Sequence, residues 1–450
     1  MTAPARTTAF HALVAITAGR ADLPDALATT RASLTDDRDR ALTATIVTGA
    51  LRWQRALDHL IEHFAKRPLT KIDPQVLAIL RLSFFQLLHL DRVPASAVVD
   101  DAVSLTRTAR KSSASGFVNA ILRSMLRQRH RLPLPPRPAD PADRASALAY
   151  LGVTHSHPEW LVARWLDRYG FDRTEAWVQF NNDTPPLTLR ANTLRIPRDD
   201  LQTRLAGVEV ETSPTRYAPD GLTVTGGNPL RTSLHDLFFV QDEASQLVPL
   251  VVDAQPGERI LDLCASPGGK TVAMAASMRD EGTLVACDVR AGRLDLLRDT
   301  VGRSGARLAR IVSVPTRGAL PFTRSFDRVL VDAPCSGLGT IRRDPDIRWR
   351  RSPGDLPRLA EQQIALLMRA AETVRAGGRL VYATCSSEPE ENERVVDAVL
   401  AQAPFDRVDL RLTSPDHLRS LFDEAGALRT LPFAHRLEAF YGAALVRRVA

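Results

Sequence analysis

Two short stretches of the sequence each place a cysteine directly after an apolar, strand-like run. The first, RVLVDAPCSG, runs from Arg328 to Gly337 and brings Asp332 and Cys335 together at a turn. The second, GGRLVYATCSS, places Cys385 after its apolar run in the same way. Open α/β sheets carry their chemistry at the carboxyl ends of the strands, so an acid and two thiols here indicate nucleophilic catalysis. An isolated cysteine would be better interpreted as a small buried core residue.

The stretch LDLCASPGGKT, Leu261 to Thr271, predicts a ligand-binding turn between a strand and a helix. Gly268 and Gly269 allow backbone amides to approach a ligand at a helix N-terminus. The sequence matches neither the P-loop nor the GxGxxG pattern of NAD enzymes. The next strand ends at Asp288, where an acid can accept hydrogen bonds from ribose hydroxyls. These features favour a nucleoside ligand without a phosphate tail, such as S-adenosylmethionine.

Two thiols and an acid beside a methyl donor suit the methylation of carbon 5 of cytosine. A thiolate that adds to carbon 6 makes carbon 5 nucleophilic. An acid near ring nitrogen 3 must then balance the developing charge, and a base must later remove the proton from carbon 5. Asp332 is placed for the first of these tasks, and positive charge such as Lys270 would favour the thiolate. The spacing alone leaves open which thiol attacks.

The elements that must position these residues follow a strand, turn, helix rhythm from Gly257 onward. We expect strands at Arg259–Leu263, Thr283–Cys287, Leu308–Val314, Phe326–Asp332 and Arg379–Thr384. We expect helices at Gly269–Met278, Ala291–Gly302 and Leu356–Val374. This alternation predicts a mainly parallel sheet covered on both faces, with both thiols at one edge. Leu428–Phe433 and Phe440–Arg447 predict an antiparallel hairpin at one side of the sheet.

Residues 5–131 predict a helical bundle, because apolar residues recur at spacings of three and four. Residues 1–131 contain 19 basic and 11 acidic residues, whereas the net charge of the whole chain is +7. A basic first part joined to a nearly neutral remainder favours a polyanionic partner. The predicted last helix supplies a phosphate-facing edge of four arginines, Arg123, Arg127, Arg129 and Arg131.

Three features lie between and beyond these two parts. The stretch LPLPPRPADPAD, Leu132 to Asp143, predicts a semi-rigid spacer, because five prolines in twelve residues cannot continue a helix. The residues that follow, to 236, predict a small α+β module carrying Arg190, Asn192 and Arg195.

Between the two cysteine strands, LGTIRRDPDIRWRRSP combines five arginines with a tryptophan, which predicts contact with single-stranded or looped RNA. A solvated loop with a packed tryptophan is the alternative.

The composition is that of a globular chain, with 44% apolar and 25% charged residues. A length of 450 residues predicts two or three domains. The four cysteines form no CxxC pair, which disfavours a disulfide framework or a metal site and indicates a reducing cytoplasm. We also expect neither a secretory signal nor a membrane contact. Only four of the 59 basic residues are lysine, so the lysine at position 270 suggests a compact ammonium there.

These residues and motifs together resemble the bacterial Sun/RsmB family of ribosomal RNA cytosine-5 methyltransferases. Three of its motifs are similar to LDLCASPGGKT, VLVDAPCSGLGTIRRDPDIRW and YATCSS, and the stretch that leads into its catalytic domain is similar to FFVQDEAS. LRWQRALDHLIEHF and SGFVNAILR are similar to the NusB-like RNA-binding domain joined to this family. The resemblance implies a multidomain protein with an all-α NusB-like bundle, a small α+β linker module and an α/β Rossmann-like methyltransferase domain. The expected boundaries are 1–131 for the bundle, 132–145 for the linker, 146–236 for an RNA-contacting module and 237–450 for the catalytic domain.

The resemblance also implies a role for each site residue. Cys385 is the nucleophile, Cys335 assists product release, and Asp332 serves both the cofactor and the cytosine. Lys270 matches the family's motif lysine in the catalytic site, and Asp288 binds the ribose of S-adenosylmethionine. The methionine part of the cofactor is held by Cys264, Ala265, Ser266, Pro267, Gly268, Gly269 and Lys270.

One position departs from the family pattern. After the third strand the family presents an aspartate toward adenine, whereas IVSVPTRGALPF has Pro315 there. Proline offers neither a side-chain acceptor nor an amide donor, so adenine must be held by other groups or bound more weakly.

The main hypothesis is a monomeric enzyme that transfers a methyl group to carbon 5 of a cytosine in small-subunit (16S) ribosomal RNA. One alternative is cytosine-5 methylation of transfer RNA by the same chemistry. A noncatalytic NusB-like RNA-binding factor is the alternative of a different class, and in it serine would replace both thiols without effect. An amino-group methyltransferase is disfavoured, because DAPC lacks the acid or amide followed by Pro-Pro and an aromatic residue.

Overall fold

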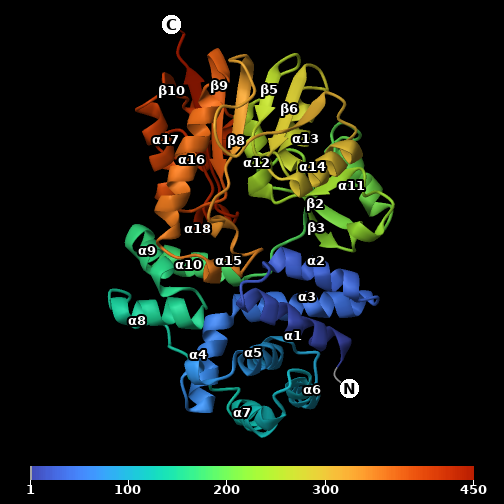
Figure 1. The fold of residues 1–450 in the computed structure, drawn as a ribbon, viewed down its shortest axis with the longest axis vertical. Coiled ribbons are helices and arrows are strands. Elements are labelled where there is room, and N and C mark those ends of the chain that lie inside the picture. Colours follow the sequence, from blue (N-terminus) through green and yellow to red (C-terminus); the bar gives the residue numbers. More distant parts are fainter. Residues whose placement is uncertain (1–2, 450) are drawn as a thin grey trace. The chain divides into compact units, whose positions relative to one another are not determined.

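The computed structural model describes residues 3–449 and divides into two compact units. The first contains the described residues up to Thr184 together with Ile341–Pro353, and the second contains Pro185–Thr340 and the described residues from Gly354 onward. The division at Thr184 falls inside the predicted 146–236 module, so the expected domain boundaries stay predictions. Figure 1 shows the helices of the first unit and the large sheet of the second.

The first unit is helical, and most of its helices share one apolar core. Gly49 lets two helices approach closely, because a Cβ atom there would lie 1.9 Å from the ring of Phe85. The arginines of the predicted phosphate-facing edge are exposed at and beyond the end of α7. The core helices are α1 (Pro4–Thr17), α2 (Leu23–Ser33), α3 (Asp37–Arg52), α4 (Gln54–Ala65), α5 (Pro74–His89), α6 (Ala95–Thr108) and α7 (Ser115–Arg127).

Three further helices belong to the first unit: α8 (Arg144–Ala149), α9 (Glu159–Tyr169) and α10 (Phe171–Asn182). The rings of Trp165 and Trp177 stack between α9 and α10 with centroids 4.6 Å apart, and both side chains are fully buried. The predicted spacer at 132–143 has no helix or strand, as its prolines require.

The arginine-rich segment Ile341–Pro353 packs into this helical unit rather than forming a free RNA-binding loop. Arg348, in the short helix α15 (Ile347–Arg350), is fully buried and donates to the carbonyls of Ser156 and Asn181 and to the side chain of Asn182. The indole of Trp349 donates to the Leu51 carbonyl at 2.6 Å. The prediction of an RNA contact is therefore wrong for Arg348, whose buried guanidinium is held by protein groups. For Trp349, which is partly exposed, and for the other four arginines it stays a prediction.

The second unit begins with a small antiparallel sheet in the order β2-β3-β1-β4. Its strands are β1 (Thr188–Ala191), β2 (Glu211–Pro214), β3 (Gly221–Gly226) and β4 (Phe238–Val240), and α11 (Arg198–Ala206) packs against them. Three polar residues predicted here have internal partners. Arg190 is buried over the ring of Phe239, and Asn192 and Arg195 donate to the Ser304 carbonyl.

The large sheet of the second unit has the strand order β10-β12-β9-β8-β5-β6-β7, with β11 paired to β12. Strands β5 to β9 are parallel, and β12 runs antiparallel to β9. The parallel strands are β5 (Arg259–Asp262), β6 (Thr283–Asp288), β7 (Ala309–Ser313), β8 (Phe326–Asp332) and β9 (Val374–Thr384), which confirms the predicted parallel sheet. The remaining strands are β10 (Phe405–Arg407), β11 (Leu428–Arg429) and β12 (Tyr441–Arg447).

Helices cover both faces of this sheet, as Figure 1 shows. Alternate strand residues point to opposite faces, so Leu330 packs in one apolar core while Val329 and Val331 pack in the other. One face is covered by α12 (Glu243–Val252), α13 (Gly269–Ser277) and α14 (Ala291–Ser304). The other is covered by α16 (Asp355–Ala371) and α17 (Glu393–Leu400).

Two details differ from the predicted elements. Strand β9 starts at Val374, where the sequence predicted the end of the preceding helix, because the apolar pattern of α16 continues to the strand without a break. The predicted antiparallel pairing is present between β11 and β12, but its position differs. Strand β12 lies between β9 and β10 rather than at the side of the sheet. Within the described residues, none of the helices combines the length and apolar character that a bilayer crossing requires.

Candidate active site

The register of two parallel strands brings the two predicted thiols together. Asp332 on β8 lies opposite Ala383 on β9, so Cys335 and Cys385 leave the sheet three and two residues later at the same edge. Their sulfur atoms are 3.3 Å apart, and both cysteines are partly exposed. Neither is in a disulfide. The geometry confirms the expected adjacency of the thiols.

An ammonium–carboxylate pair lies at the same edge. Lys270 Nζ is 2.7 Å from Asp332 Oδ2, and both side chains are mostly buried. Burial opposes the charged form of the lysine, but the Asp332 carboxylate more than offsets this and raises the pKa of Lys270 above its usual value. A Cys385 thiolate acts in the same direction, so the lysine and this thiol are close enough for their charges to interact. The Lys270 ammonium also lies 5.8 Å from the centre of the Phe440 ring.

The glycine-rich turn joins β5 to α13, the helix that carries Lys270. Gly268 has a φ of +107°, a backbone conformation that favours glycine, and a Cβ atom there would lie 2.9 Å from Leu297. The carbonyl of Ser266 accepts from the Arg293 guanidinium at 2.9 Å. Helix α13 then begins at Gly269, with Lys270 in its first turn. The turn therefore presents backbone to the cavity and the lysine to Asp332.

The sequence did not predict a role for the carboxyl group at the end of β5. Asp262, the last residue of β5, is 1% exposed and accepts from the Thr271 hydroxyl at 2.6 Å. Burial raises the pKa of Asp262 to about 7, and the nearby Asp332 carboxylate adds to the rise. Its other oxygen, Oδ1, has no hydrogen-bond partner.

The end of β6 presents Asp288 as predicted. Its Oδ1 accepts from the backbone amides of Val289 and Arg290, and its Oδ2 lies 3.3 Å from Arg293 Nε. At the end of the next strand, Pro315 is exposed, and its carbonyl accepts from a distant arginine at 2.8 Å. The predicted lack of an acidic group at this position therefore holds in the structure.

The thiols differ in their surroundings. The hydrogen bond with Cys385, followed by burial, raises the pKa of Cys335 well above that of a free cysteine. Burial likewise raises the pKa of the Cys264 thiol and raises that of Cys287 to about 12. These three groups therefore hold their protons at neutral pH, so Cys335 can donate a hydrogen bond to the Cys385 sulfur.

A cavity of about 370 Å³ opens beside the lysine and the glycine-rich turn. Its walls include Asp332 at the end of β8, Gly269 and Lys270 at the start of α13, and Phe239 and Gln241 from the small sheet and the residues after it. Predicted residues at 265–267 also line it. The cavity therefore reaches the Lys270–Asp332 pair, whereas Cys335 and Cys385 are not among its lining residues.

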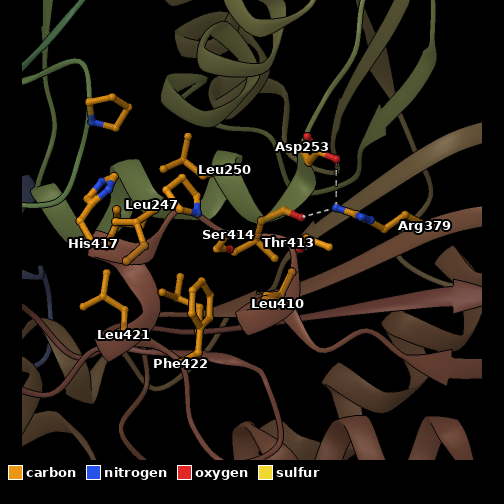
Figure 2. Close-up of a pocket in the computed structure, with 15 residues that line it drawn as sticks. Leu247, Leu250, Asp253, Arg379, Leu410, Thr413, Ser414, His417, Leu421 and Phe422 are labelled. Carbon is orange, nitrogen blue, oxygen red and sulfur yellow. Dashed lines mark hydrogen bonds and ion pairs between the residues drawn. The ribbon is translucent and has the colours of Figure 1, made fainter.

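A different cavity, of about 300 Å³, has an apolar wall and contains none of the predicted site residues. Figure 2 shows Leu247, Leu410 and Phe422 around it, with the Asp253–Arg379 ion pair at one end at 3.4 Å. Asp253 and Arg379 pair with each other, and the other polar side chains that line it are Thr413, Ser414 and His417.

Sequence reasoning also missed the buried residues that hold the thiol loops. Glu391 and Asn392 follow β9 and bond to the residues next to both cysteines. In the sequence they belong to the acidic run EPEEN, which is typical of a solvated turn. Only the burial of both side chains distinguishes them.

Comparison with known protein families places three matches along the chain. The model described as 16S rRNA methyltransferase RsmB/F matches residues 249–446, and the NusB family model matches residues 3–127. An RsmF/B-like ferredoxin-like domain matches residues 157–231, which identifies the small α+β module. These matches confirm the predicted fold class.

Whole-chain relatives agree with these matches. The chain is 34% identical over 411 residues to the probable ribosomal RNA small subunit methyltransferase B of Bacillus subtilis, covering 90% of each chain. It is 34% identical to ribosomal RNA small subunit methyltransferase B of Pseudomonas putida, covering 92% of each. Among solved structures, PH0851 is similar over 99% of both chains, with 26% identity and a TM-score of 0.78. A methyltransferase homolog from Pyrococcus horikoshii matches 67% of this chain and 99% of its own, with 27% identity and a TM-score of 0.57. The predicted resemblance is confirmed, and the chain belongs to the RsmB/F family of 16S rRNA methyltransferases.

Proposed function

We propose that this protein transfers a methyl group from S-adenosylmethionine to carbon 5 of a cytosine in small-subunit ribosomal RNA, through a covalent cysteine–cytosine intermediate. The observation that carries the proposal is the thiol pair, 3.3 Å apart, beside the Lys270–Asp332 ion pair. A methyltransferase that acted on an amino group would need neither thiol.

The residues of the sheet edge fit S-adenosylmethionine. Ser266, Pro267 and Gly269 line the cavity and fit the methionine part, and Asp288 at the end of β6 is the acid that we expect to bind the ribose hydroxyls. When bound, this cofactor supplies an electrophilic methyl group. With Pro315 unable to contact adenine through a side chain, we expect backbone groups to hold that ring.

Cys385 is the attacking thiol in this proposal. Its neighbour Cys335 holds its proton and can donate a hydrogen bond to a Cys385 thiolate, which stabilises the anion. The Lys270 ammonium supplies positive charge close to the same sulfur. The thiolate then bonds to carbon 6 of the cytosine, and carbon 5 becomes nucleophilic.

The later steps use the second thiol and the carboxylate. Asp332, held by Lys270, is oriented to interact with ring nitrogen 3 as charge develops there. Once the sulfur of Cys385 is bonded to the ring, the hydrogen bond that most raises the pKa of Cys335 is lost. The pKa of Cys335 then falls, so its thiol can release its proton to solvent. The resulting Cys335 thiolate takes the proton from carbon 5, and this elimination releases the Cys385 thiolate and the methylated product.

We infer that the RNA partner is small-subunit ribosomal RNA, since the named relatives are methyltransferases of that RNA. The basic NusB-like part supports binding to a polyanion, and its exposed arginines at 123–131 fit phosphate contacts. On this proposal the protein acts in the cytoplasm as a monomer.

Incubation with S-adenosylmethionine and protein-free small-subunit RNA, followed by bisulfite sequencing, tests the proposal. We expect one protected cytosine that appears only with enzyme and cofactor together. A parallel incubation with transfer RNA distinguishes the alternative substrate. If neither RNA gains 5-methylcytosine while the protein still binds RNA, the noncatalytic alternative is correct.

A further inference from the structure

One buried carboxylate touches the residues next to both reactive cysteines and has no part in the mechanism above. Glu391 lies just before α17 and is 0% exposed. It accepts four hydrogen bonds, from the backbone amide and hydroxyl of Ser336, the hydroxyl of Ser386 and the amide of Gln363. Ser336 directly follows Cys335, and Ser386 directly follows Cys385.

We propose that Glu391 is a positioning residue for the methyl transfer, which joins the two cysteine loops through one carboxylate and holds their thiols side by side. This inference rests on the proposed function, because it assigns a task within the same reaction. Glu391 does not touch the reacting atoms itself.

The hydrogen bonds divide between the two carboxylate oxygens in a way that couples the loops. Oε1 accepts from the Ser336 amide at 2.7 Å and from Gln363 Nε2 at 3.0 Å. Oε2 accepts from both serine hydroxyls, which are themselves 3.2 Å apart. Because Oε2 bonds to a serine of each loop, a displacement of either loop would break a hydrogen bond to the oxygen that also holds the other loop.

Surrounding elements fix the carboxylate in turn. The Tyr382 hydroxyl, from the middle of β9, donates to the Glu391 carbonyl at 2.6 Å. Asn392 donates to the Ser386 carbonyl at 3.0 Å and accepts from the Thr384 hydroxyl. Gln363 on α16 also donates to the Pro334 carbonyl at 3.0 Å, so the helix that crosses between β8 and β9 joins the same network.

The charge of Glu391 also acts on the thiol pair. Besides the bond to Cys385 and burial, the nearby Glu391 carboxylate contributes to the raised pKa of Cys335. This favours the protonated form of Cys335, which can donate a hydrogen bond to the Cys385 sulfur. The geometric argument stands without this effect, because the four hydrogen bonds already define the two loops.

Three variants test the inference by kinetics. Glu391→Ala removes all four hydrogen bonds, Glu391→Gln keeps the shape and lets the serine hydroxyls turn to accept from the amide, and Ser386→Ala removes one bond. We expect kcat to fall by about 100-fold for the alanine variant and about tenfold for the other two, with KM for RNA and cofactor unchanged. The matched control is Glu243→Gln, since Glu243 is another carboxylate of the second unit that accepts from backbone amides, at Tyr217 and Ala218.

The graded series keeps the test valid if Glu391→Ala does not fold, because Glu391→Gln and Ser386→Ala then decide it. The inference is overturned if these folded variants keep the wild-type kcat, or if only KM changes. A loss of the same size in Glu243→Gln would also overturn it, since any carboxylate that accepts from backbone amides would then have the effect.

A second measurement is independent of methyl transfer and so separates this inference from the proposed function. Phenylarsine oxide bridges two neighbouring thiols, forming two arsenic–sulfur bonds while the two thiol protons and the arsenoxide oxygen leave as water. We expect wild-type protein to bind it one to one, the variants Cys335→Ser and Cys385→Ser to lose binding, and Glu391→Ala or Glu391→Gln to weaken it at least about tenfold. Equal binding by wild type and both Glu391 variants would overturn the inference even if methylation is confirmed. If methylation fails, weakened binding would still show that Glu391 holds the two thiols together, and only its task in methyl transfer would be lost.

Discussion

Two clusters of polar side chains, one at the end of strand β8 and one in the segment that follows it, have different surroundings. Asp332 and Cys335, at the strand end, keep reactive atoms open to a cavity or to a neighbouring thiol. Arg348 and Trp349, further along the chain, donate hydrogen bonds to backbone carbonyls within the helical unit. Residue type alone does not separate the two clusters. The difference is the kind of partner: an ammonium or a second thiol at the sheet edge, and backbone carbonyls in the helical unit.

The two clusters also differ in how charge is compensated. The Lys270–Asp332 pair balances one charge against another and remains partly exposed, so each group can exchange its partner for a substrate. Arg348 has no carboxylate partner: it donates to carbonyl oxygens and contacts a ring nitrogen of His157. Burial, with the nearby positive charge of Arg52, lowers the pKa of Arg348 well below the usual value for arginine. A buried guanidinium of this kind stabilises a fold and cannot be released to bind phosphate.

The largest expected effect comes from removing the thiols, which breaks the reactive cluster outright. Cys385→Ser should lower methyl transfer by at least about 10³-fold without a covalent protein–RNA complex, because no nucleophile remains. Cys335→Ser should instead accumulate the covalent complex, because the carbon 5 proton cannot leave. Denaturing gel electrophoresis of protein on labelled RNA measures both. The opposite pattern would exchange the roles of the two cysteines.

The second prediction removes the charge of the reactive cluster and keeps its thiols. Lys270→Met should lower the rate of methyl transfer by about 10²-fold, because the Asp332 carboxylate loses its partner and the thiolate loses nearby positive charge. Single-turnover transfer of a labelled methyl group measures the rate.

The matched control is Lys111→Met, which removes another 2.7 Å lysine–aspartate pair, the more exposed one with Asp73. It should cost less than about 1 kcal/mol of stability and leave methyl transfer unchanged. Equal losses in both variants would mean that Lys270 has no special role.

The third prediction concerns the buried cluster. Arg348→Met should lower the free energy of unfolding by about 3 kcal/mol, because several buried carbonyls lose their donor. Its effect on RNA affinity should follow the loss of folded protein alone. Urea unfolding monitored by tryptophan fluorescence, together with RNA binding of the folded fraction, measures both quantities.

An exposed arginine on α7 provides the contrast. Arg123→Met should leave stability unchanged, weaken RNA binding and reduce the slope of log affinity against log salt by about 1, as expected for one phosphate contact. If Arg348→Met weakened RNA binding in fully folded protein, the separation of the two clusters would be incorrect.

The parts of this molecule that were predictable depend on local pattern. The apolar runs of β5, β8 and β9 and the helix between the last two were enough to place Cys335 beside Cys385. The parts that were not predictable depend on distant partners. Nothing near Arg348 in the sequence indicates that carbonyls of residues 156 and 181 will surround it, and nothing near Glu391 indicates that its carboxylate is buried.

The last prediction concerns Asp262, a buried acid beside the reactive cluster. Its pKa is raised from 3.8 to about 7, so the folded state prefers the protonated form. The stability linked to this proton is fully present below about pH 4 and is lost as the pH rises through about 7. Asp262→Asn keeps an acceptor for the Thr271 hydroxyl but cannot ionise. We therefore expect the variant to unfold at higher urea than wild type at pH 8, with the gap closing between pH 7 and pH 5. A constant gap across this range would show that the Asp262 carboxylate is already ionised, and that its charge belongs with the Lys270–Asp332 pair.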